Sequence, residues 1–348
     1  MDYRKIYIFY FSGTGNAKQI ATWFSELTVE KGTECQLFNM AETDVKSIDY
    51  IDPQDLLIFI APIHGFNYPK TALRFIRKFP KGKNRIVLMC TRGGTRIGPL
   101  LIPGITGAAF IVSSIILKIK GYVVAGQVPF DMPTNWTSLH PAPGDKTMKS
   151  ILEKNQIRVR KHFEIIYSGK NDYAARKEVI LDIITGIPSF AYLYWGRFFL
   201  SKTLYASSKC TQCNLCVRDC PVKAITIVDK RPYWSIKCES CMHCINICPF
   251  RAIEAAHGLL VLVFYLWIVG TPILMGLLPL LFHHWLIAFL VFDVLLFFGL
   301  LFLLYRFQHF LLKNRTVAKI IAYTSLTHYK FWRRYKQFEY QDFKSNYK

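Results

Sequence analysis

Short hydrophobic runs alternate with segments of helical spacing over the first half of the chain. Residues 5–11 form a continuous apolar and aromatic run, typical of a strand buried on both faces of a parallel sheet. Residues 17–31 follow with a pattern compatible with a helix. Similar strand-like runs recur at residues 34–38, 56–61, 85–90 and 122–128. This succession predicts an α/β fold with a doubly wound parallel sheet.

Three further segments are rich in apolar residues, but their patterns do not predict strands. Residues 105–119 are strongly apolar but too short to span a bilayer, so we expect a crossover helix into the fifth strand. Residues 145–166 alternate basic and apolar positions and predict an amphipathic closing helix. Residues 180–205 are apolar and aromatic but contain Pro188 and Arg197, which are costly inside a membrane span. An interfacial or interdomain segment is the expected role there.

Two long apolar segments near the C-terminus predict a transmembrane hairpin. Residues 259–282 carry no charge, and residues 286–305 carry only Asp293. Both exceed the roughly 18 residues that mark a membrane helix. His283 and His284 fall in the short turn between them. A buried helical hairpin is the alternative, and the absence of an amphipathic stripe speaks against it.

Charge divides the chain into the same blocks. The net charge is +21, yet residues 258–305 hold no basic residue, whereas residues 306–348 hold ten against two acidic ones. Basic residues on both flanks of the hairpin predict that both termini face the cytoplasm at the cell inner membrane. The tail interleaves basic and aromatic residues. Directly after a membrane helix, we expect it to bind anionic lipid headgroups rather than nucleic acid.

Eight cysteines carry the strongest chemical signal. The pattern C-x2-C-x2-C-x3-C-P occurs twice, with cysteines at Cys210, Cys213, Cys216, Cys220, Cys238, Cys241, Cys244 and Cys248. Two cubane clusters fit this spacing, with the fourth ligand of each taken from the other run. We therefore expect one 4Fe-4S cluster on Cys210, Cys213, Cys216 and Cys248, and the other on Cys238, Cys241, Cys244 and Cys220. Structural zinc and disulfides are the weaker alternatives.

This cysteine pattern resembles bacterial-type eight-iron ferredoxins. The stretch Ser12, Gly13, Thr14, Gly15 and Asn16 follows the first predicted strand, where glycines and hydroxyls at a helix N-terminus suit a phosphate. An ordinary β-α turn is the alternative. The stretch resembles the phosphate loop of flavodoxins. That resemblance implies strand order 2-1-3-4-5, with a flavin beyond the carboxyl ends of the strands.

By the same resemblance, two further loops flank the flavin and FMN is the implied cofactor. They contain Pro62, His64, Gly65, Phe66 and Asn67 after the third strand, and Thr91, Arg92, Gly93 and Gly94 after the fourth. Arg92 near the ring would favour the anionic reduced flavin. Packing within the loop is the alternative for His64, Phe66 and Tyr68. Residues 130–136 resemble the corresponding segment of flavodoxin-ferredoxin fusion proteins, so the resemblance covers residues 1–256.

The resemblance implies a domain order and an electron-transfer role. We expect a flavodoxin-like FMN domain at 1–168, an apolar linker at 169–206, an α+β bacterial ferredoxin-like domain at 207–257, the hairpin at 258–305 and the tail at 306–348. A flavin accepts two electrons and a cubane carries one. The leading hypothesis is a membrane-tethered electron carrier that links a soluble low-potential donor to a membrane or membrane-adjacent acceptor through redox partner proteins.

Two enzymatic alternatives stay open at this point. One is a flavin-dependent reductase of a small organic substrate, fed by its own clusters, with His64, Trp136 and His140 over the ring. The other is a quinone-linked reductase that uses Asp293 and the histidine turn. Asp293 has a simpler explanation as an acid hydrogen-bonded to the first membrane helix. The sequence assigns no catalytic residue.

Overall fold

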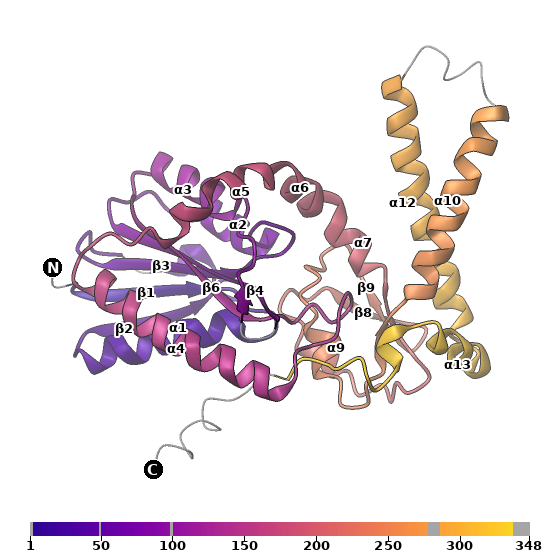
Figure 1. Cartoon of the computed structure of the whole chain (residues 1–348), viewed down its shortest axis with the longest axis horizontal. Helices are drawn as coiled ribbons and strands as arrows, with labels where there is room; N and C mark the ends of the chain where they lie inside the picture. Colours follow the sequence, from indigo (N-terminus) through magenta and orange to yellow (C-terminus); the bar gives the residue numbers. More distant parts are fainter. Residues whose placement is uncertain (1–2, 49, 98–99, 278–285, 337–348) are drawn as a thin grey trace.

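A parallel sheet with helices on both faces forms the N-terminal part of the computed structural model, which describes residues 3–48, 50–97, 100–277 and 286–336 (Figure 1). The spatial order is β2-β1-β3-β4-β6, which confirms the predicted 2-1-3-4-5 order. The strands are β1 (Lys5–Tyr10), β2 (Glu34–Asn39), β3 (Leu56–Pro62), β4 (Arg85–Ile97) and β6 (Val123–Pro133). A short strand, β5 (Leu100–Ile102), pairs antiparallel with the end of β4.

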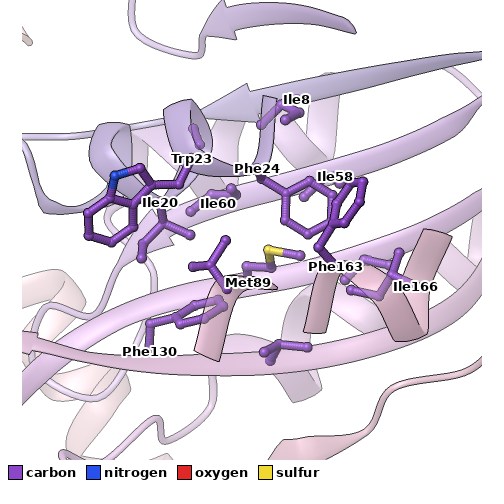
Figure 2. Packing of buried hydrophobic residues seen from close by; sticks show 14 of the residues in the cluster. Ile8, Ile20, Trp23, Phe24, Ile58, Ile60, Met89, Phe130, Phe163 and Ile166 are labelled. Atoms are coloured by element: carbon purple, nitrogen blue, oxygen red, sulfur yellow. The ribbon is translucent and has the colours of Figure 1, made fainter. Parts of the chain in front are cut away.

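Helices α1 (Asn16–Glu30) and α4 (Asp145–Tyr167) cover one face of the sheet. Their aromatic residues meet over the strands, with the Phe24 and Phe163 ring centroids 5.0 Å apart (Figure 2). Met89 and Phe130 rise from β4 and β6 into the same cluster. Burying one side chain of this size stabilises the fold by about 1.5–3 kcal/mol. This face therefore anchors the first strand-to-helix turn to a dense core.

The opposite face is covered by α2 (Lys70–Lys78) and α3 (Ala109–Ile119). Phe9 and Phe59 project from the central strands, and Phe79 at the end of α2 packs edge-on against both of them. Helix α3 buries Phe110 and Leu117 against the sheet. The apolar segment at 105–119 is therefore the crossover helix that its length predicted.

The connection to the cysteine-rich part is a bent series of short helices. The helices are η2 (Ala174–Glu178), α5 (Val179–Ile184), α6 (Gly186–Ala191), the π-helical turn η3 (Tyr192–Gly196) and α7 (Arg197–Ser201). Residues 174–184 and 186–201 form apolar halves that meet at 77°. Ile180 and Ile187 are exposed on this segment, so its outer side is strongly apolar.

Short strands and one-turn helices build the cysteine-rich part. Strand β7 (Leu204–Ala206) pairs antiparallel with β10 (Ile253–Ala255), and β8 (Ile225–Val228) with β9 (Arg231–Trp234). Helices α8 (Leu215–Arg218) and α9 (His243–Ile247) each follow a residue in the left-handed region, Asn214 and Met242. The two cysteine runs thus fold in the same local way.

Two apolar helices project away from the rest of the molecule (Figure 1). They are α10 (His257–Leu277) and α12 (Leu286–Leu311), and both are long and apolar enough to cross a membrane. The predicted turn, with His283 and His284, lies outside the described residues. After α12, the chain forms α13 (Arg315–Tyr323) and the turn η4 (Leu326–His328), and it then runs back toward the sheet.

Candidate functional site

The loop after β1 presents the N-terminus of α1. Gly15 adopts φ 99°, a left-handed conformation that glycine tolerates, and its N–H donates to Ser12 Oγ at 3.1 Å. Within the described chain, no side chain caps the start of α1. The first N–H groups of a helix carry a partial positive charge. This geometry is compatible with the phosphate site that the sequence predicts.

The polar side chains of this loop are held by distant segments. Asn16 donates through Nδ2 to the Pro133 carbonyl at 3.0 Å, and its Oδ1 accepts from the Tyr335 hydroxyl at 2.6 Å. Thr14 accepts a hydrogen bond from Asn135. Thr14, Gly15 and Asn16 are buried. The second half of the loop is thus preorganised and shielded from water, whereas Ser12 and Gly13 are half-buried.

The second predicted loop forms a tight turn at the end of β3. The His64 N–H donates to the Asn67 carbonyl at 2.8 Å, and Gly65 and Phe66 both have positive φ. The Tyr192 ring lies against Gly65 so closely that any side chain at 65 would collide with it. The buried Nδ1 of His64 has no hydrogen-bond partner among the described residues, and burial lowers the pKa of His64. A neutral imidazole with a free ring nitrogen fits a flavin's polar edge.

The third predicted loop is a strand, which corrects the expectation from the sequence. Thr91, Arg92, Gly93 and Gly94 lie within β4 and pair with β6. The Arg92 side chain is buried and donates to Asp131 at 2.7 Å and to Glu178. It therefore forms a structural ion-pair cluster instead of lying over a flavin ring. Glu178 lies 86 residues away from Arg92 in the sequence. No local sequence pattern predicts that these two residues pair.

The first set of cysteines surrounds a pocket. Cys210, Cys213, Cys216 and Cys248 all line it, and these are the four that the spacing assigned to one cluster. Cys213 is exposed, and the Ala252 N–H donates to Cys248 Sγ at 3.3 Å. A pocket lined by these four cysteines, with an amide donor to the sulfur of one of them, fits a cubane cluster.

The second set of cysteines is more deeply enclosed. Cys220, Cys238 and Cys244 are buried. The Ala224 N–H donates to Cys220 Sγ at 3.3 Å and the Ser240 N–H to Cys238 Sγ at 3.4 Å. Burial raises the pKa of Cys238 to about 12, so a thiolate here requires a bound cation. Among the described residues, no three His, Cys, Asp or Glu side chains converge on one ion. A 4Fe-4S cluster does not require this, because each of its four cysteines binds a different iron.

The phosphate loop and the second cysteine set touch each other. A Cβ on Gly13 would overlap Cys241, and its distance to Cys241 Sγ would be 3.0 Å. Trp136 donates through Nε1 to the Ser240 carbonyl at 3.0 Å, and its ring packs against Tyr192 with centroids 5.7 Å apart. The predicted flavin site and the second cluster site are therefore neighbours.

Sequence reasoning missed a carboxylate that joins the two parts. The carboxylate of Glu239, next to Cys238, accepts two hydrogen bonds from Thr71, one from the N–H at 2.8 Å and one from the hydroxyl at 2.7 Å. It also accepts from the Lys70 N–H at 3.3 Å. These donors form the first turn of α2, where a negative charge is favourable. Glu239 is 4% exposed. No pattern in the sequence distinguishes this glutamate from a surface residue.

Comparison with known proteins agrees with this division. Residues 7–96 match the family model described as flavodoxin domain, and residues 209–253 match the one described as 4Fe-4S dicluster domain. No curated protein matches the sequence. Among solved structures, two-electron reduced flavodoxin of Megasphaera elsdenii is similar at 16% identity, with 37% of this chain and 88% of that chain covered and a TM-score of 0.29.

Oxidised flavodoxin 1 of Bacillus cereus is also similar, at 16% identity, with 45% of this chain and 98% of that chain covered and a TM-score of 0.29. The two matched domains have FMN and two 4Fe-4S clusters as their cofactors. The sheet order and the two cysteine runs described above agree with both matches. The chain thus contains a flavodoxin domain and a 4Fe-4S dicluster domain, which together support an electron-transfer role, and two apolar helices follow them.

Proposed function

We propose that this protein is a membrane-tethered relay in which electrons pass between FMN and two 4Fe-4S clusters in a fixed spatial order. The observation that carries the proposal is the contact between Gly13 of the phosphate loop and Cys241 of the second cysteine set. Because these two sites adjoin, the cluster on Cys220, Cys238, Cys241 and Cys244 lies between the flavin and the other cluster. FMN exchanges two electrons and each cluster exchanges one. The chain would therefore convert between two-electron and one-electron transfer.

The residues proposed to hold FMN come from the loops after β1 and β3 and from the second half of β4. They are Ser12, Gly13, Thr14, Gly15 and Asn16 for the phosphate, and Pro62, His64, Gly65, Phe66, Asn67, Thr91, Gly93 and Gly94 beside the ring. Arg92 drops out of direct contact because its guanidinium is bound by two carboxylates. The eight cysteines of the two runs are the proposed cluster ligands, divided as their spacing predicts.

The protein's own side chains keep the flavin site and the second cluster at a constant separation. Glu239 fastens the cysteine-rich part to the first turn of α2. Thr137 donates to Asn246 Oδ1 at 2.9 Å, which adds a second tie close to α9. Trp136 and Tyr192 fill the space beside these ties with aromatic rings. A rigid, dry junction of this kind suits repeated electron transfer without loss to solvent.

The exposed side of the first cysteine set is the proposed docking surface for redox partner proteins. Cys213 is exposed there, and Ile227 and Phe250, which line the same pocket, are exposed apolar residues. Lys230 lies at its rim. An apolar centre with a charged edge is typical of a protein interface. A partner bound here would contact the end of the relay that is farther from the flavin.

The two apolar helices are the proposed membrane anchor. Basic residues flank both of their soluble ends, so the positive-inside bias supports cytoplasmic redox domains at the inner membrane. Asp293 accepts from Trp267 Nε1 at 2.9 Å and from Thr271 Oγ1 at 3.0 Å. These bonds from α10 make Asp293 a link between the two helices, so we assign it no part in substrate or quinone chemistry. The anchor would hold the domains 1–168 and 207–257 at the membrane surface, with 169–206 between them.

The decisive experiment is anaerobic purification in detergent, followed by quantification of iron, sulfide and flavin and by a reductive titration. We expect about eight irons and one FMN per chain. After rapid photoreduction of the flavin, its absorbance should recover as the cluster signals appear in EPR. Electrons that stay on the flavin while intact oxidised clusters are present would contradict the relay.

A further inference from the structure

The chain after η4 forms a strap, residues 329–336, between the cysteine-rich part and the flavodoxin domain. On the cysteine-rich side, Arg334 donates to the Ile245 carbonyl and, at 3.1 Å, to the Arg251 carbonyl. Arg251 in turn donates to the Tyr329 carbonyl at 3.1 Å and the Trp332 carbonyl at 3.0 Å. Backbone and side chains together fasten the strap to the helix that carries Cys244.

The same strap is fastened to the flavodoxin domain. Trp332 donates through Nε1 to the Thr137 carbonyl at 2.7 Å, and the Ala142 N–H donates to the Arg333 carbonyl at 2.9 Å. The Tyr335 ring packs with Ala142 and Met148 in a small cluster of its own. Trp332 is 9% exposed and Tyr335 is 5% exposed. These two side chains are buried in protein, so they do not face lipid headgroups.

The Tyr335 hydroxyl ends at the phosphate loop. It donates to Asn16 Oδ1 at 2.6 Å, while Asn16 Nδ2 donates to the Pro133 carbonyl. The side-chain amide of Asn16 is thus held at both ends. Asn16 is the first residue of α1, whose N-terminal N–H groups are the proposed phosphate donors. Burial raises the pKa of Tyr335, so the hydroxyl keeps its proton and remains a donor.

We propose that the strap completes the FMN phosphate site, with Tyr335 acting as a positioning residue that fixes Asn16 and closes the loop against water. The inference rests on the proposed FMN site. Excluding water strengthens the hydrogen bonds between amides and phosphate, because they act in a lower dielectric. The strap therefore retains FMN on the protein, and the segment that follows the membrane hairpin becomes part of the cofactor site.

The test compares flavins with and without the phosphate on the purified full-length chain in detergent. Dissociation is followed by the recovery of flavin fluorescence. Tyr335→Phe removes one buried hydroxyl and leaves the ring, so we expect FMN to dissociate roughly tenfold faster. Riboflavin, which lacks the phosphate, should bind the variant and the wild type equally well. Phe331→Ala, at an exposed position of the same strap, serves as the control. It should change the dissociation of neither FMN nor riboflavin.

A second variant guards against a folding effect. Trp332→Phe removes the indole N–H that reaches Thr137 but keeps an aromatic ring, and we expect about a threefold faster FMN dissociation. Equal weakening of FMN and riboflavin, or unchanged FMN dissociation in both variants, would overturn the role at the phosphate. A wild-type chain that binds no FMN would instead refute the proposed function, so the two failures can be distinguished.

Discussion

The two cysteine runs share one spacing but lie in different surroundings. In the first set, Cys213 is exposed and Cys210 and Cys248 are half-buried. In the second set, Cys238 and Cys244 are buried, and Cys241 lies against Gly13 of the flavodoxin domain. The local fold of both runs is similar, down to a left-handed residue before each short helix. The difference in burial therefore comes from the other parts of the chain that pack against each set.

In the relay that we propose, this difference assigns the two sites to different positions. The enclosed set is in contact with the flavin loop, and the open set faces solvent. Enclosure also disfavours the extra negative charge of a reduced cluster, because solvent exposure and hydrogen bonding help to set cluster potentials. We therefore expect the enclosed cluster to have the lower potential. A repeated motif can thus acquire two roles without any change in its ligands.

The largest expected effect separates the two sets by removing one ligand from each. Cys213→Ala should lower the iron content from about eight to about four per chain and leave a flavin that still reduces the remaining cluster. Cys241→Ala should also abolish the fast oxidation of photoreduced flavin, because it removes the adjoining cluster. Iron analysis and stopped-flow absorbance measure both results. If Cys213→Ala stopped flavin oxidation and Cys241→Ala did not, the proposed order would be reversed.

Exposure to oxygen or a chelator should distinguish the sets in the unmodified protein. The cluster on the open set should be lost several-fold faster, since solvent reaches Cys213 directly. EPR at successive times would show one cluster signal fading while the other persists. Simultaneous loss of both signals would mean that the enclosed set gains no protection from the flavodoxin domain.

Glu239 tests the tie that encloses the second set. Glu239→Gln replaces the charged acceptor at the start of α2, and a buried donor left without a partner costs about 1–3 kcal/mol. We expect the free energy of unfolding to fall by that amount and the enclosed cluster to become more sensitive to oxygen. Glu30→Gln, at an exposed position on α1, is the matched control and should change neither quantity. An unaltered oxygen sensitivity in Glu239→Gln would show that the tie does not maintain the enclosure.

The smallest effect is expected in the proposed membrane anchor. Asp293→Asn keeps an oxygen that accepts from Trp267 and Thr271, and hydrogen bonds between membrane helices contribute on average about 0.6 kcal/mol. Cluster content, flavin oxidation and the difference between the two sets should stay unchanged. A strong loss of electron transfer in this variant would give Asp293 a functional role and extend the comparison into the membrane.

The sequence signals for the candidate site are local. The loop from Ser12 to Asn16 and the eight cysteines carry their chemistry in their spacing, and the sheet order follows from alternating strands and helices. The prediction for Arg92 was wrong because it assumed a loop after residue 90. The strand continues there, and the guanidinium is bound by Asp131 and by Glu178, which approaches from a distant helix.

The sequence by itself determined the modules: a doubly wound sheet, two cysteine runs and two apolar helices, each encoded by periodicity or spacing over a few dozen residues. Only the tertiary structure decided how they meet. Gly13 touches Cys241, Glu239 caps α2, and Tyr335 reaches Asn16 across more than 300 positions of the chain. Such contacts depend on the shape of folded surfaces and on the loops that bring them together. No local sequence pattern predicts these contacts, because the residues next to each partner in the sequence carry no signal of them.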